Sequence, residues 1–302
     1  MNYELGSGTN PRQAVETMNI DQLIQGDMLE VAPKLEKGTF RLIYIDPPFL
    51  TGKEQVGTKE GLVYDDRWEG DFDSYLPWLR QRLEVLYPLL SENGSIVLHL
   101  DWRASHYARV MLDEIFGREG FMNEIIWHYT GGGRSKSRFS CKHDTLLWYA
   151  KCGKSGKPVY NLDAVRVPYK ETSGYAKGGI VSAAGKKYMP NPLGTPCDDV
   201  WDIPIINPMS NERVGYPTQK PLALLKRIIS ALSNEGDLVG DFCFGSGTTL
   251  VAAKMLNRHY FGCDISPAAV ETAKSRLSEQ ICEETQTKQN QEFTQQTLPF
   301  ND

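Results

Sequence analysis

One stretch near the carboxyl end constrains the fold more than any other. Residues Asp237 to Phe242 form a short apolar run typical of a buried strand, Gly245-Ser246-Gly247 follows, and a helical pattern then runs to about Leu256. Glycines at such a junction permit a tight turn and close approach of the backbone to a ligand. Another strand, His259 to Cys263, ends on Asp264. This alternation predicts an α/β protein with a parallel sheet.

Other segments repeat the alternation of strand and helix. The apolar run Phe40 to Ile45 stops at two prolines, as expected of a buried strand that ends in a loop. From about Gly131 to Ser210 the pattern lapses into Gly-rich, Pro-rich and basic sequence, except for one strand at Thr145 to Ala150. The remaining predicted elements are helices at Phe72 to Leu90, Ala104 to Phe116, Leu222 to Leu232 and Pro267 to about Ile281, and a strand at Ser95 to Leu100.

The charge of the chain is unevenly distributed. The net charge is −5, but residues 131–190 hold twelve Lys or Arg against three acids, so this segment is +9 and the remainder is −14. A local basic patch is the electrostatic footprint of a phosphate-binding surface. A solvated lysine-rich loop region is the alternative interpretation. The twelve basic residues are Arg134, Lys136, Arg138, Lys142, Lys151, Lys154, Lys157, Arg166, Lys170, Lys177, Lys186 and Lys187.

Two classes of protein are disfavoured by the sequence. No apolar run approaches the roughly 18 residues of a membrane span, and Met1 to Pro11 lacks the apolar core of a signal peptide, so we expect a cytoplasmic protein that does not bind membranes. The six cysteines show no CxxC spacing. We therefore expect neither a metal site nor a disulfide framework.

The glycine loop and the acid that follows it suggest a nucleoside site. Asp264 comes about 20 residues after the loop, where a carboxylate can accept hydrogen bonds from both ribose hydroxyls. A dinucleotide site would require a third glycine, whereas Thr248 and Thr249 follow Gly247, and no P-loop lysine is present. A nucleoside without phosphates fits better, although an NAD-dependent oxidoreductase stays as an alternative that cofactor titration would separate.

A second polar cluster, Asp46-Pro47-Pro48-Phe49, follows a different strand that should end at the same crevice. A carboxylate and a proline-fixed carbonyl can together accept both hydrogens of a flat amino group, while an aromatic ring stacks on the attached base. Drawing the nitrogen out of the ring plane would localise its lone pair for attack on a methyl sulfonium, without a covalent enzyme intermediate. The same tripeptide also forms ordinary loops.

Several of these motifs, in this order, resemble the amino-methylating DNA methyltransferases of bacteria and phages. Asp46 to Phe49 is similar to their catalytic motif, Asp241 to Thr249 to their cofactor loop, and Gly215 to Pro221 to the segment before it. Gly26-Asp27 is similar to their adenine-contacting acidic position. The catalytic motif precedes the cofactor loop, which is the permuted order of the β class, and the resemblance spans roughly residues 20–280.

This resemblance implies a Rossmann-like fold that binds S-adenosylmethionine: a mainly parallel seven-stranded sheet with helices on both faces and its last strand antiparallel. Residues 1–130 would form the catalytic half, 131–210 an inserted target-recognition region, 211–282 the cofactor half and 283–302 a disordered tail. The implied catalytic residues are Asp46, Pro47, Pro48 and Phe49. The implied cofactor-binding residues are Asp27, Lys220, Pro221, Asp241, Phe242, Phe244, Gly245, Ser246, Gly247, Thr248, Thr249 and Asp264.

The implied substrate is a base flipped out of double-stranded DNA. In this family an Asp at the first catalytic position usually accompanies adenine and a Ser accompanies cytosine, so Asp46 favours the 6-amino group of adenine. Phe49 departs from the more frequent Tyr and loses a hydroxyl contact. Phosphate contacts are expected from Arg134, Lys136, Arg138 and Lys142 in the glycine-rich basic loop.

Further partners are suggested more weakly. The resemblance makes a homodimer plausible and leaves open whether a restriction enzyme accompanies the protein. Gln295 to Phe300 is similar to the short peptides with which replication proteins dock on the sliding clamp, an inert polar tail being the alternative.

Two other functions would use a similar chain. An RNA or protein amino-methyltransferase generally has Asn at the first catalytic position and its cofactor loop first, and both features differ here. A catalytically silent DNA-binding module would be expected to lose Asp46 or the glycines, which are all present.

Overall fold

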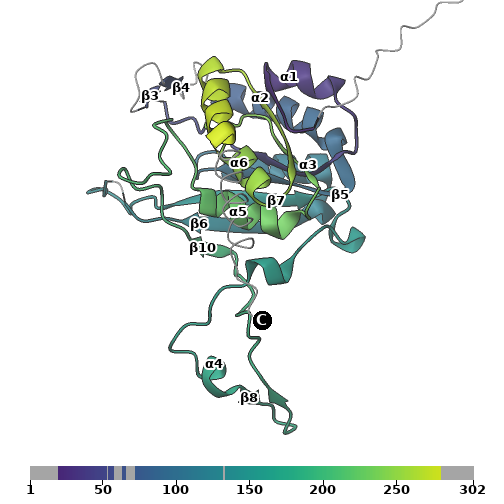
Figure 1. The fold of residues 1–302 in the computed structure, drawn as a ribbon, viewed down its shortest axis with the longest axis vertical. Coiled ribbons are helices and arrows are strands. Elements are labelled where there is room, and N and C mark those ends of the chain that lie inside the picture. The colour runs from purple at the N-terminus through teal and green to yellow at the C-terminus, as the bar shows by residue number, and fades with distance from the viewer. Residues whose placement is uncertain (1–19, 53, 58–62, 66–71, 132, 280–302) are drawn as a thin grey trace, which may run out of the picture.

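The computed structural model describes residues 20–52, 54–57, 63–65, 72–131 and 133–279. Its centre is an eight-stranded sheet in the order β1-β12-β11-β2-β5-β7-β6-β10 (Figure 1). The strands are β1 (Gln22–Gln25), β2 (Phe40–Ile45), β5 (Leu90–Leu100), β6 (Phe121–His128), β7 (His143–Ala150), β10 (Val200–Asp202), β11 (Leu238–Asp241) and β12 (His259–Asp264). The predicted α/β fold with a mainly parallel sheet is confirmed.

Helices cover both faces of this sheet, and the side chains of β2 show how. Alternate residues of a strand point to opposite faces. Ile43 and Ile45 pack on one face with the core side chains of α1, α2 and α3, whereas Leu42 and Tyr44 pack on the other with those of α5 and α6. The helices are α1 (Met28–Val31), α2 (Phe72–Leu86), α3 (Ser105–Phe116), α5 (Leu222–Leu232) and α6 (Thr248–Met255), and residues 267–279 are also helical.

The sheet differs in two respects from the expected one. It has eight strands rather than seven, and its antiparallel strand is β7, which lies inside the sheet between β5 and β6 instead of being the last. The physical reason is a hairpin: β6 and β7 are joined by the basic loop, and a hairpin partner must run antiparallel. Strand β10 then adds beside β6 in parallel, which extends the sheet beyond the hairpin.

The segment 131–210, expected as an insertion, therefore contributes β7 and β10 to the main sheet. Between them the chain makes an excursion that Figure 1 shows hanging below the sheet. An antiparallel bridge between Val167 and Thr195 closes its neck. The excursion holds α4 (Gly174–Gly178) and the two-stranded β8 (Ile180–Val181) and β9 (Lys187–Tyr188).

The remaining short elements lie between the main ones. They are η1 (Ala32–Lys34), β3 (Glu54–Val56), β4 (Val63–Asp65), η2 (Tyr87–Leu89), η3 (Arg118–Gly120), η4 (Lys154–Gly156) and η5 (Leu162–Val165). Within the described ranges, no helix combines the length and apolarity needed to cross a membrane. The tail expected to be disordered and its peptide Gln295 to Phe300 lie outside the described residues.

Gly247 is required by packing as well as by backbone conformation. Its φ is +76°, and a Cβ at this position would lie 2.6 Å from Cβ of Ala273 in the carboxyl-terminal helix. We predict that Gly247→Ala lowers the free energy of unfolding by about 2 kcal/mol, because left-handed strain and overpacking add. Chemical denaturation would measure this change. Gly178→Ala is the control, because no atom lies within 4 Å of its added Cβ, and an equal loss in both variants would contradict the packing argument.

Candidate active site

Four neighbouring strands deliver carboxylates to one edge of the sheet. Strands β1, β12, β11 and β2 are parallel neighbours, and each ends on or beside an aspartate. Because parallel strands end at the same edge, their loops surround one crevice. The four residues are Asp27, Asp264, Asp241 and Asp46.

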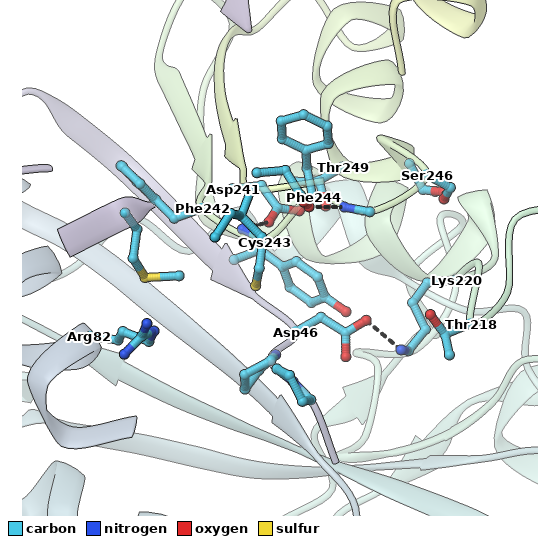
Figure 2. A pocket seen from close by; sticks show the side chains of 18 of the residues that line it. Asp46, Arg82, Thr218, Lys220, Asp241, Phe242, Cys243, Phe244, Ser246 and Thr249 are labelled. Carbon is cyan, nitrogen blue, oxygen red and sulfur yellow. Dashed lines mark hydrogen bonds and ion pairs between the residues drawn. The ribbon is translucent and has the colours of Figure 1, made fainter. Parts of the chain in front are cut away.

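A cavity of about 300 Å³ occupies this crevice (Figure 2). Its lining includes most of the residues that the sequence assigned to catalysis and cofactor binding: Asp27, Asp46, Pro47, Pro48, Lys220, Asp241, Phe242, Phe244, Gly245, Ser246, Thr248, Thr249 and Asp264. Phe49, Pro221 and Gly247 are not among its lining residues; Pro221 caps α5 and Gly247 caps α6. Tyr216 and Thr218, from the motif Gly215 to Pro221, also line it, as do Tyr44, Trp78 and Arg82, which the sequence did not single out.

The glycine loop is held by contacts from later in the chain. Asp264 accepts hydrogen bonds from the backbone N–H of Gly245 at 2.9 Å and of Ser266 at 2.9 Å. Arg276, buried in the carboxyl-terminal helix, donates from Nη1 to the Ser246 carbonyl at 2.8 Å and to Thr248 Oγ1 at 2.9 Å. The sequence signal for Arg276, a single cation on the inner face of an otherwise apolar helix, was available but was not used.

The Asp46 carboxylate uses its two oxygens differently. Lys220 Nζ forms an ion pair with Oδ2, and Figure 2 shows the carboxylate pointing toward this lysine. Oδ1 is buried and has no hydrogen-bond partner among the described residues. Such an acceptor is costly to bury unsatisfied, so it is a place where a ligand hydrogen would be stabilised.

A ring of aromatic and polar groups surrounds this carboxylate. Lys220 Nζ also lies 4.8 Å from the centre of the Phe49 ring, and the Phe49 ring lies 5.4 Å from that of His99. Tyr75 donates its hydroxyl to the Pro48 carbonyl at 2.8 Å, which fixes the loop after Asp46. The catalytic motif is therefore braced from α2 and from the segment before α5.

His99 is the centre of a buried network that sequence reasoning missed. It is fully buried, its Nδ1 lies 2.6 Å from the Tyr44 hydroxyl and 3.9 Å from Asp46 Oδ1, and its Nε2 lies 3.2 Å from Asp144 Oδ2. The Tyr129 hydroxyl donates to the other oxygen of Asp144 at 3.0 Å. Burial alone would raise the pKa of Asp144, but the contacts with His99, Lys220 and Tyr129 together lower it. In the tautomer that carries its hydrogen on Nε2, His99 donates to Asp144, and its Nδ1 accepts from the Tyr44 hydroxyl.

Asp27 plays a structural part in addition to its place in the lining. Its side chain caps α1 by accepting from the Leu29 N–H at 2.9 Å, and it lies 3.4 Å from Arg82 Nη2. The Arg82 guanidinium in turn stacks 3.9 Å from the Trp78 ring centre. Because the cap and the ion pair satisfy part of its charge, Asp27 is held in a fixed orientation at the rim.

The four basic residues expected to contact DNA lie on the loop between β6 and β7, at the same sheet edge. Arg134, Lys136 and Arg138 are exposed there. Lys142 instead donates to the carbonyls of Gly131 and Gly133, at 3.1 Å for Gly133, and thereby braces the loop.

Comparison with known proteins identifies the family. A model of the DNA methylase family that groups N6 and N4 methyltransferases matches residues 40–275. The type II methyltransferase M.HpaI of Haemophilus parainfluenzae is 32% identical over 260 residues, covering 86% of this chain and 75% of that protein. The DNA adenine methyltransferase YhdJ of Escherichia coli K12 is 29% identical over 256 residues, covering 84% of this chain and 82% of that protein.

Solved structures show the same fold. The cytosine-N4-specific PvuII DNA methyltransferase superposes with a TM-score of 0.60 at 19% identity, covering 86% of this chain and 87% of that one. A complex of M1.HpyAVI with S-adenosylmethionine gives a TM-score of 0.56 at 23% identity, covering 85% and 98%. The chain belongs to the N6/N4 family of DNA methylases, as its motifs predicted, and its cofactor is S-adenosylmethionine.

The charge of the cavity suits this cofactor, which carries a cationic sulfonium and an amino group. Burial raises the pKa of Asp241 to about 7, with the charges of Asp46 and Asp264 adding to the effect and the Thr249 hydroxyl and Cys243 N–H opposing it. Burial likewise raises the pKa of Asp264. A cation placed among these carboxylates would favour their ionised forms.

Asp241 should therefore make cofactor binding depend on pH. Below about pH 7 its carboxyl is protonated and cannot attract a cation, and above it the carboxylate can. We predict that the affinity for S-adenosylmethionine rises about tenfold between pH 6 and pH 8, since binding is linked to loss of one proton. Isothermal titration calorimetry at both pH values measures this rise.

Two variants separate this effect from other titrations. Asp241→Asn should bind weakly at both pH values, without the rise. Glu235→Gln removes an exposed acid just before the amino end of β11, the strand that ends at Asp241, and should keep the rise in affinity. Retention of the full rise in Asp241→Asn would refute the assignment.

Proposed function

We propose that this DNA methylase transfers a methyl group to the 6-amino group of adenine, in a base flipped out of double-stranded DNA. The observation that carries the proposal is the Asp46 carboxylate, with one oxygen bound to Lys220 and the other buried and unpartnered. A free, desolvated acceptor at the rim of the cofactor cavity fits an exocyclic amino group.

Two residues of the catalytic motif each accept one hydrogen of the target amino group. Asp46 Oδ1 accepts one amino hydrogen, and the Pro47 carbonyl, next to it at the cavity wall, accepts the other. The Pro48 carbonyl is already used by Tyr75. Two acceptors orient the nitrogen lone pair away from the base ring, which raises its reactivity. When bound, S-adenosylmethionine supplies the methyl group on its sulfonium.

Lys220 and Phe49 complete the arrangement. The ion pair with Lys220 holds the Asp46 carboxylate in place through Oδ2, and Oδ1 remains able to accept a hydrogen bond. After transfer the amino nitrogen carries one proton too many, and Oδ1 is placed to take it. Phe49 offers a ring beside this carboxylate on which the flipped base can stack.

The choice of adenine rests on the aspartate at position 46. The similarity to the DNA adenine methyltransferase YhdJ agrees with this choice, whereas the cytosine-N4-specific PvuII enzyme shares the fold. Cytosine methylated at its 4-amino group is therefore the second candidate. A DNA substrate and bacterial relatives favour action in the cytoplasm.

Product analysis tests the base. Purified protein is incubated with S-adenosylmethionine and unmethylated DNA of mixed sequence, which is then digested to nucleosides and examined by mass spectrometry. We expect N6-methyladenine. N4-methylcytosine would keep the mechanism and overturn the base, and the absence of any methylated base would overturn the proposed activity. Sequencing the same DNA for methylated positions gives the recognised site.

Asp46 should be needed for turnover and dispensable for cofactor binding. We predict that Asp46→Ala lowers the rate at least about a thousandfold, because a preorganised acceptor is lost, while the Kd for S-adenosylmethionine changes by less than about threefold. Methyl transfer is measured under single-turnover conditions and the Kd by calorimetry. A large loss of cofactor affinity would contradict the assigned role, and the exposed Glu235→Gln again serves as a control for handling.

A further inference from the structure

The loop between β6 and β7 rises from the sheet edge that carries the catalytic carboxylate. Strand β7 runs antiparallel to β5 and β6, so its start at His143 lies where β5 and β6 end. Figure 1 shows this loop reaching beyond the sheet beside β6. It is therefore placed to meet whatever approaches Asp46 from outside.

Phe139 stands exposed on this loop. It is 99% exposed, the highest value among the large apolar side chains of the described residues. Single exposed apolar residues are common on protein surfaces, so exposure alone decides nothing. The surroundings of Phe139 are more specific.

The loop that presents Phe139 is structured and basic. The Ser135 N–H donates to Ser140 Oγ at 2.9 Å, and the Arg138 N–H donates to Ser135 Oγ at 3.2 Å, which closes a short turn that contains Phe139. The sequence from 129 to 142 contains four Lys or Arg and no acid. An apolar side chain flanked only by cations fits a polyanion with an apolar interior, and stacked DNA has that chemistry.

Phe139 lines a cavity that also reaches the polar network beside Asp46. This cavity, of about 270 Å³, is lined by Tyr129 and Asp144 as well. Asp144 contacts His99 at 3.2 Å, and His99 lies 3.9 Å from Asp46 Oδ1. The Arg138 guanidinium, next in sequence, lies 5.5 Å from the ring centre of Trp102, which follows the end of β5. The cavity that Phe139 lines thus reaches Asp144, which is two interactions away from the atom proposed to receive the target amino group.

We propose that Phe139 is a wedge that enters the base stack of the duplex at the place vacated by the flipped target base. This inference rests on the proposed function, since it concerns the same reaction. Extruding a base leaves a gap in the stack, and an inserted apolar side chain offsets part of the cost of unstacking. Arg134, Lys136 and Arg138 hold the flanking phosphates while the ring enters.

The test compares a paired target with one that is already unpaired. Two duplexes carry the recognised site found by sequencing, one with the target base paired and one with it opposite an abasic position. For Phe139→Ala we expect the single-turnover rate on the paired duplex to fall at least about tenfold, because extrusion loses its support. On the abasic duplex the rate should return to within about threefold of the unsubstituted protein. Phe139→Leu should retain most of the activity on both.

Controls make each outcome decisive. Val110→Ala shortens another exposed apolar side chain, on α3, and should leave both rates unchanged. The wedge would be overturned if Phe139→Ala lost the same factor in rate on both duplexes, or lost none on either. A change in the oligomeric state of Phe139→Ala, measured by sedimentation, would also overturn it, because the ring would then lie in a contact between protein chains. Turnover of the unsubstituted protein on both duplexes checks the proposed function separately.

Discussion

Charge repulsion among carboxylates at one sheet edge is the constraint around which the rest of the site is arranged. Parallel neighbours bring Asp27, Asp46, Asp241 and Asp264 to a single cavity, and like charges in a poorly solvated place oppose one another's ionisation. Each acid is relieved in its own way. Asp46 has Lys220, Asp27 has Arg82 and a helix N-terminus, and Asp264 has two backbone N–H groups. Asp241 accepts hydrogen bonds from Thr249 and from the Cys243 N–H, but its complete burial outweighs them, and its raised pKa leaves it responsive to a cationic ligand.

The fold and much of the cavity could be predicted because their signals are local. A strand followed by glycines and a helix, or by Asp-Pro-Pro, identifies the carboxyl end of a parallel strand, and such ends share an edge. Strands β1, β6 and β10 were not predicted. Their residues are mostly polar or partly exposed, as in Gln22–Gln25 and Val200–Asp202, and only pairing with a neighbour makes them strands.

The residues that support the site were harder to find because their roles depend on distant parts of the chain. His99 lies within a predicted strand and Asp144 directly before another, and only the antiparallel placement of β7 beside β5 brings them together. Lys142 was predicted to contact DNA because it lies in the basic loop, whereas its ammonium donates to two carbonyls of that loop. A count of charges gives no information about which of them are already engaged.

Several contacts of the site join residues that are far apart in the sequence, which determines when the site can form during synthesis. Asp46 meets Lys220 only when 174 further residues have been made, and the glycine loop is braced by Arg276, near the end of the described residues. Strand β1 pairs with β12, the last strand within the described residues. A ribosome-bound chain that holds only Asp46 to Phe49 lacks the side chains that brace this cavity. Synthesis must therefore have passed Arg276 before the cavity described above can be complete.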